Sequence, residues 1–317
     1  MAFNIVGRED VAGEMVPDQI TKEILKEAPS QSIMLERAKR VPMSKAKVKQ
    51  PVLNTLPEAY WVDGDTGLKK TSKADWKNVT MTAEELAVIV PIPDALIDDS
   101  DVPLWNEIKP LIVEAIGKKV DQAAIFGTEK PDSWPEAIVP ASIAAQNVVQ
   151  RGTGKDIAVD IANLAKTVAR DGFAVNGFAS MPGLQWELVG MRTETGQPIY
   201  SPSLAPGQPN GLYGYPLNEV TSGVWDDKVA QVLAADWSKF VVGVRQDITF
   251  DLFSEGVISD DDGKVVFNLM QQDAKALRVV FRVGFQVANP VTRLNTTETR
   301  YPAGVLTPPD STTDQEL

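Results

Sequence analysis

The acidic clusters are the residues whose type and spacing come closest to chemistry. Asp98, Asp99 and Asp101 offer carboxylate oxygens, which bind hard cations and serve as acids and bases in hydrolases. Asp260 and Asp262 resemble the opening of a calcium loop, but no glutamate follows at the spacing that completes one. No pair of acids with hydrolase geometry is visible. We therefore expect the first cluster to cap a helix or lie in a solvated loop, and the second to form a turn.

Residues 151–156, RGTGKD, superficially resemble a phosphate-binding loop. The match fails because Val149 stands where the first glycine belongs and Asp156 replaces the Ser or Thr that should follow the lysine. The chain also contains no cysteine and no histidine. That absence excludes disulfides, thiolate nucleophiles, Cys/His zinc sites and Ser-His-Asp triads. We expect no catalytic, cofactor-binding or metal-binding residues.

The composition indicates a globular protein with about two domains. The chain has 317 residues, of which 43% are hydrophobic, and its net charge is −12. The longest apolar run, LAVIV at 86–90, is too short to cross a bilayer, and the N-terminus shows no secretory signal. We expect synthesis in the cytoplasm. Proteins that grip nucleic-acid phosphates are usually basic, so the acidic balance disfavours that function.

The stretch from 103 to 127 predicts the central element, a long amphipathic helix. Its apolar residues recur at spacings of three and four, and Gly127 is placed for a left-handed C-terminal cap. Pro110 removes one helical hydrogen bond, so we expect either a kink or a short first helix with Pro110 opening the main one. The apolar stripe consists of Ile108, Leu111, Ile112, Ala115, Ile116, Val120, Ala123 and Ala124.

The first 49 residues indicate an N-terminal arm. A short helix is expected at 17–29, and one or two further helical turns at 30–39. Lys45, Lys47 and Lys49 alternate with apolar residues, so on a strand they share one face. That face is read as solvated, or as a contact with an acidic neighbour or with nucleic acid.

Residues 50–82 predict a two-stranded projection. AYWV (59–62) and WKNVTM (76–81) are strand-like, and the turn formers DGDTG lie between them. An isolated hairpin is marginal in water, so the aromatic side chains of Tyr60, Trp61 and Trp76 should pack against something else. A neighbouring subunit is a reasonable host.

The remaining sequence alternates between strand and helix signals. After a buried strand near 85–90, a helix is expected at 156–171, with Asp156 as its N-cap and Gly172 as its stop. A second helix should run from about 181 to Thr195-Gly196. Alternating strands are predicted at 240–254 and 276–287, and a disordered tail from Pro302.

In this order, five stretches resemble the major capsid proteins of tailed bacteriophages, which have the Hong Kong 97-like fold. Residues 59–100 resemble the family's extended loop and its return strand, and 104–131 its spine helix. The pattern SMPGLQWELVGMRTETGQPIY…GLYGYPL is similar to the axial domain. Residues 232–252 and 276–294, which include ALRVVFRVGFQVANP, resemble the closing strands. The likeness spans about 50–294.

The resemblance implies an α+β subunit without enzymatic activity. It would have an N-terminal arm, an extended β-hairpin loop, a peripheral domain built on the spine helix, and an axial domain. Chains that carry their own scaffold have a long helical segment before the arm, whereas the arm here is short. The implied boundaries are 1–49 for the arm, 50–82 for the loop, 83–150 and 236–300 for the peripheral domain, 151–235 for the axial domain, and 301–317 for a flexible tail.

The implied function is self-assembly through pentamers and hexamers into an icosahedral head around double-stranded DNA. Implied partners are other copies of the chain, with a scaffolding protein, portal and decoration proteins, and no membrane. The alternatives are an encapsulin-type nanocompartment shell and a carboxylate hydrolase that uses acids such as Asp98. Some members of the family crosslink through a loop lysine, for which Lys69 and Lys70 are candidates. The predicted inter-subunit contacts are Tyr60, Trp61, Asp63, Lys69, Lys70 and Trp76.

Overall fold

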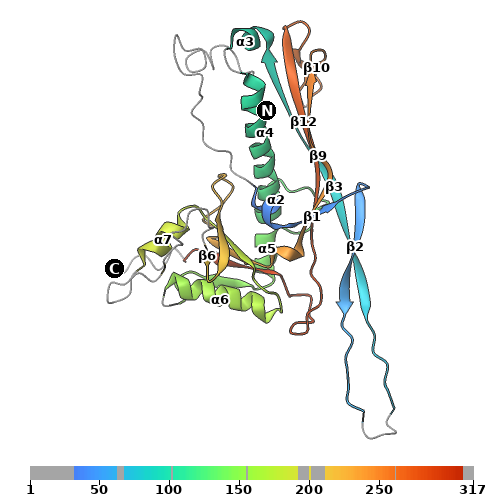
Figure 1. Cartoon of the computed structure of the whole chain (residues 1–317), viewed down its shortest axis with the longest axis vertical. Helices are drawn as coiled ribbons and strands as arrows, with labels where there is room; N and C mark the ends of the chain where they lie inside the picture. The colour runs from blue at the N-terminus through green and yellow to red at the C-terminus, as the bar shows by residue number, and fades with distance from the viewer. Residues whose placement is uncertain are drawn as a thin grey trace.

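The computed structural model shows a long helix and two β-sheets, with a hairpin that projects from the body (Figure 1). Within the part of the chain that is described, no helix is long and apolar enough to span a membrane. The structure describes residues 32–62, 68–100, 103–154, 156–191, 200, 211–260 and 262–309. The helix expected at 17–29 lies outside these ranges.

Helix α4, Leu104–Asp121, is the spine helix that the sequence predicted. It continues as a π-helix, Gln122–Phe126, and ends at Gly127, whose φ of 81° gives the expected left-handed cap. The interpretation in which Pro110 opens the main helix is wrong, because Pro110 lies inside one continuous helix that starts six residues earlier at Leu104. Most of the predicted apolar stripe faces the core, where Ile112, Ile116, Val120, Ala123 and Ala124 are buried. The prediction is wrong for Leu111 and Ala115, which are exposed.

The first sheet has five strands in the order β1-β9-β12-β3-β2. Strand β12 pairs antiparallel with both β3 and β9, and β1 pairs parallel with β9. Alternation on β12 is confirmed: its odd-numbered residues from Leu277 to Phe285 are buried, while Arg278 and Arg282 are more exposed and pair with acids of the neighbouring strands. The bounds are β1 Lys39–Pro42, β2 Lys47–Thr55, β3 Asp75–Pro93, β9 Phe240–Phe253 and β12 Ala274–Val287.

The second sheet has six strands in the order β4-β13-β8-β5-β7-β6. Helix α6, Ile157–Arg170, contributes Ile161, Leu164 and Val168 to the buried core. Its predicted N-cap is confirmed, since the Asp156 side chain accepts a hydrogen bond from the amide of Val159. The bounds are β4 Val148–Gln150, β5 Gly177–Ser180, β6 Gly211–Leu212, β7 Tyr215–Glu219, β8 Val232–Ala235 and β13 Ala303–Thr307.

The prediction of a flexible tail over 301–317 is wrong for its first part. Strand β13 lies inside the second sheet between β4 and β8, and Ala303, Val305 and Leu306 are fully buried. The Pro, Ser, Thr and Asp content of the whole tail hid a short apolar run, AGVL, that is flanked by prolines. The rest of the tail, 310–317, lies outside the described residues.

The helix predicted from about residue 181 is shorter than expected. Helix α7, Leu184–Gly190, ends because Met191 is extended, so the predicted end at Thr195-Gly196 is wrong. Residues 192–199 lie outside the described part of the chain. The remaining elements are α2 Ile33–Arg37, α3 Asp94–Asp99, α5 Ile138–Ala144, a 3-10 turn Trp237–Lys239, β10 Val257–Ser259 and β11 Val265–Asn268.

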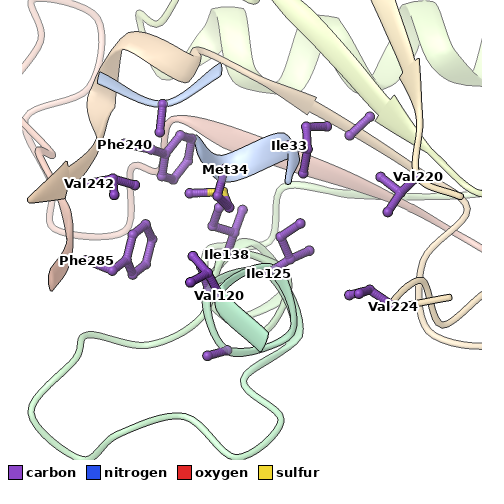
Figure 2. Close-up of a cluster of buried hydrophobic side chains, with 14 of the residues drawn as sticks. Ile33, Met34, Val120, Ile125, Ile138, Val220, Val224, Phe240, Val242 and Phe285 are labelled. Carbon is purple, nitrogen blue, oxygen red and sulfur yellow. The ribbon is translucent and has the colours of Figure 1, made fainter. Parts of the chain in front are cut away.

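One apolar core joins the two sheets at the C-terminal end of the spine helix. Figure 2 shows Met34 of α2, Val120 and Ile125 of the spine, and Phe240 and Phe285 of the first sheet around the same space. The rings of Phe240 and Phe285 stack with centroids 6.5 Å apart. The arm, the spine and the sheets are therefore packed as one body.

Candidate subunit interface

The projecting hairpin is formed by β2 and the first half of β3. The strands pair antiparallel from Lys47↔Thr82 to Thr55↔Asp75, and beyond them two limbs, 56–62 and 68–74, continue without strand pairing. The prediction that 59–62 forms a strand is therefore wrong, and the paired strand lies upstream at Lys47–Thr55. Pro57 accounts for part of this, because it has no N–H to donate to a ladder.

The predicted contact residues lie on these limbs and, for Trp76, at the start of β3 next to them. Trp61 is 100% exposed, Trp76 is 62% exposed, and Lys69 and Lys70 are exposed as well. Single exposed apolar side chains are common, but a fully exposed tryptophan at the far end of a projection is not. Asp63 lies outside the described residues.

Tyr60 and Lys70 are brought together across the two limbs. The Tyr60 hydroxyl donates to the carbonyl oxygen of Lys70, and the Lys70 ammonium lies 5.9 Å from the centroid of the Tyr60 ring. One further bond joins the limbs, from the Glu58 amide to Ser72 Oγ at 2.7 Å. Side chains, rather than a backbone ladder, therefore hold the limbs side by side.

Residues 289–301 fix the hairpin to the body at the far end of β2 and the start of one limb. The amide of Val291 donates to the carbonyl of Leu53 at 3.0 Å, and the Arg293 guanidinium donates to the carbonyl of Pro57 at 3.2 Å. The Arg300 side chain in turn donates to the carbonyls of Asn289 and Pro290. These bonds set the direction in which the hairpin leaves the body.

Asp171, at the end of α6, holds the same segment from the side of the second sheet. Its carboxylate accepts from Asn147 Nδ2 at 2.8 Å, from Asn295 Nδ2 at 2.7 Å and from the amide of Tyr301 at 2.9 Å. Its carbonyl accepts from Thr292 Oγ1 at 2.6 Å. One buried carboxylate thus ties the second sheet to the segment that supports the hairpin.

A second buried carboxylate, Asp121, anchors the arm to the last turn of the spine helix. It accepts from Ser32 Oγ at 2.6 Å and from the amides of Ile33 and Met34 at 3.0 Å each. Burial raises its pKa to about 6, and the three hydrogen bonds act in the opposite direction. This contact was not predicted from the sequence. Its one signal was an acid in the last turn of a helix, where the helix dipole favours cations.

A groove of about 540 Å³ runs between the spine helix and β3, and its walls are mostly apolar. Glu84, Glu85 and Glu129 lie on it beside Lys118 and Lys119. The groove was not predicted, because it depends on how a helix and a distant strand pack. Its other lining residues are Leu86, Ala87, Val88, Ala115, Ile116, Val120, Gln122, Ala123, Pro131, Trp134 and Val283.

The described residues contain no group of three or more carboxylates that could hold a metal ion. Asp98 and Asp99 end helix α3, and Asp101 lies outside the described ranges. Asp260 accepts from the amides of Asp262 and Lys264, so the second acidic cluster forms the predicted turn.

Comparison with known proteins gives one consistent result. The model of the phage capsid family matches residues 12–292. The chain belongs to the phage capsid family. It is 27% identical over 292 residues to the major capsid protein of Staphylococcus phage 80alpha, covering 90% of this chain and 85% of that one.

Solved structures agree with this assignment. A structure from Microbacterium phage Oxtober96 is 35% identical and matches 96% of this chain and all of its own, with a TM-score of 0.81. A structure from Mycobacterium phage Cain is 31% identical with a TM-score of 0.82, covering 97% of this chain and all of its own. The α+β fold is thus the Hong Kong 97-like capsid fold, and the chain is a phage major capsid protein and a component of the virion. The encapsulin alternative is not favoured.

Proposed function

We propose that this chain assembles through pentamers and hexamers into an icosahedral head that encloses double-stranded DNA, and that its role is structural rather than catalytic. The observation that carries this proposal is the projecting hairpin, whose limbs expose Trp61 fully and pair with no strand of the described residues. Membership of the capsid family supplies the partner class, which is further copies of the same chain.

The exposed side chains of the hairpin can contribute most of their burial free energy only when they pack against a neighbouring subunit. A tryptophan buried at the centre of a protein interface typically contributes on the order of 2–4 kcal/mol. In a closed shell, each subunit both gives a hairpin and receives one, so modest contacts add over many copies. We propose Tyr60, Trp61, Asp63, Lys69, Lys70 and Trp76 as the contact set.

The two sheets support a division of labour within the subunit. We assign the first sheet and the spine helix to the peripheral domain, and the second sheet with α6 to the axial domain. Because β4 and β13 pair within the second sheet, the axial domain gains residues 148–150 and 303–307 relative to the boundaries expected from sequence.

The acidic charge of the chain bears on how the shell meets the packaged DNA. With a net charge of −12, the wall should not bind the packaged DNA tightly or with sequence specificity. We propose assembly in the host cytoplasm, with a separate scaffolding protein, a portal and decoration proteins as further partners.

Substitution of Trp61 tests the role of the hairpin. Wild-type protein, with and without a candidate scaffold, should give closed shells of uniform diameter, or rings of five and six, in light scattering and negative-stain microscopy. Trp61→Ala should lose assembly while its free energy of unfolding stays within about 0.5 kcal/mol of wild type, because the side chain contacts solvent in the subunit.

Trp61→Phe is the matched control, since it keeps an aromatic ring and should retain assembly. If Trp61→Ala assembled as well as wild type, the hairpin would not be the contact. A wild-type chain that stayed monomeric or dimeric in every condition would contradict the proposed function itself.

A further inference from the structure

Among the described residues, strand β3 has a free edge next to the apolar groove. From Ala83 to Pro93 it pairs with β12 on one side, while β2 covers its other side only up to Thr82. The Ala83 amide donates to the carbonyl of Ala46, on the β2 side. Because backbone groups alternate along a strand, the N–H and C=O of Glu85, and of the odd-numbered residues after it, point out from this edge.

The side chains beside this edge suit an apolar strand with a basic end. Leu86 lines the groove between β3 and the spine helix, and Glu84 lies on the same face of the strand as Leu86. Glu84 accepts from Ser133 Oγ at 2.6 Å, and no Lys or Arg of the described chain pairs with it. The indole N–H of Trp134, which also lines the groove, finds no acceptor among the described residues.

The hairpin limb offers a complementary strand. Leu68, Lys69 and Lys70 are exposed, Leu68 to 90%, and none of them belongs to a strand of its own chain. The Lys70 carbonyl points to the other limb, where it accepts from the Tyr60 hydroxyl. When this limb is extended as a strand, the same alternation turns the backbone groups of Lys69 away from the other limb, where another strand can pair with them.

From these features we propose that residues 68–70 of one copy add as an antiparallel strand to the free β3 edge of a second copy. Leu68-Lys69-Lys70 then opposes Leu86-Glu85-Glu84, so that an apolar pair enters the groove and two lysines face two acids. Lys69 and Glu85 exchange backbone hydrogen bonds, and Lys70 provides the cation that Glu84 lacks. This inference rests on the proposed function and names the surface that receives the hairpin.

The donor strand must come from another molecule. Within one chain, the strand rises by ten residue steps from Asp75 to Glu85 without a break, which places the limb roughly 33 Å or more from its own acceptor edge. The hairpin also projects beyond the body, away from the spine helix (Figure 1).

A charge exchange tests the pairing of Lys70 with Glu84. In the full-length chain, Lys70→Glu and Glu84→Lys should each lose shells in negative-stain microscopy, because each places like charges opposite one another. The double variant restores the opposite signs in reverse order and should regain shells. Pairing with any other residue predicts that the double variant is at least as defective as the worse single variant, and that result would overturn the inference.

Cysteine crosslinking tests the register, and the chain suits it because it contains no cysteine. Leu68 and Leu86 would form a non-hydrogen-bonded pair with Cα atoms about 4.5 Å apart, within the range of a disulfide. Assembled shells of Leu68→Cys with Leu86→Cys should give a ladder of linked subunits under oxidising, non-reducing conditions. The control, Leu68→Cys with Val266→Cys, carries its second thiol on β11 and should give none.

The two proposals fail in different ways. Wild-type shells together with no ladder above the control would overturn the β3 docking alone. Absence of shells from the wild type would overturn the proposed function and the docking with it. A ladder combined with charge rescue supports both.

Discussion

The buried carboxylate of Asp121 makes the attachment of the arm sensitive to pH. Its pKa is raised from an ordinary value of 3.8 to about 6, chiefly because burial disfavours the charged form. The folded state therefore holds the proton more tightly than the unfolded state. Stability from this group is complete below pH about 4, falls as pH rises toward 6, and stays at its lower level above that.

The size of the effect follows from the two pKa values. Each pH unit between them corresponds to 1.36 kcal/mol, so the free energy of unfolding should decrease by about 3 kcal/mol from pH 4 to pH 7 through this residue alone. Asp121→Asn removes the titration. The substitution also places an amide N–H₂ next to the Ser32 hydroxyl and the two backbone N–H groups that now donate to the carboxylate. The lost hydrogen bonding lowers the free energy of unfolding by about 1–3 kcal/mol at any pH.

The assay is urea unfolding of unassembled subunits, wild type and Asp121→Asn, at half-unit steps from pH 4 to pH 7. Subtracting the two curves cancels the other titrating groups and leaves the contribution of Asp121. Ser32→Ala should move the fall to higher pH, because the hydroxyl that it removes lowers the pKa of Asp121. A wild-type minus Asp121→Asn difference that is flat across the range would refute the reasoning.

Two further predictions concern the spine and the last strand. Pro110→Ala should raise the free energy of unfolding by up to about 2 kcal/mol in urea melts, because it restores a hydrogen bond inside α4. A free energy of unfolding below that of the wild type would mean that the helix depends on the proline. Val305→Asp should lower the free energy of unfolding by at least about 3 kcal/mol, because an unpaired charge enters a fully buried position. An unchanged free energy of unfolding would mean that this segment is a flexible tail after all.

The parts of the fold that could be predicted from the sequence are those determined by residues close together in the chain. The spine helix was predictable because its apolar spacing, its length and Gly127 all lie within one stretch. Strand β12 was predictable because alternation over fourteen residues leaves no competing helical period. The Asp156 cap belongs to the same class, since the donor lies three residues away.

The predictions failed where the structure depends on residues that are far apart in the sequence. Strand β13 is short and lies between prolines, and only β4 and β8 on either side make its burial visible. In the proposed interface, the exposed aromatic side chains could be named from the sequence of the hairpin. Glu84, Leu86 and the groove beside them could not, because they form a site only when β3 and the spine helix pack together.

The position of the hairpin is explained by the core beneath it. Strand β3 is one element of nineteen residues whose first part pairs with β2 in the projection and whose second part pairs with β12 in the body. Where the two parts meet, Gly284 lies so close that a Cβ would stand 2.7 Å from the carbonyl oxygen of Thr82. A side chain there would push the strands apart at the root of the projection. Because one unbroken strand carries both the hairpin and the proposed acceptor edge, each subunit of the proposed assembly would fix the angle between the neighbour that it reaches and the neighbour that reaches it.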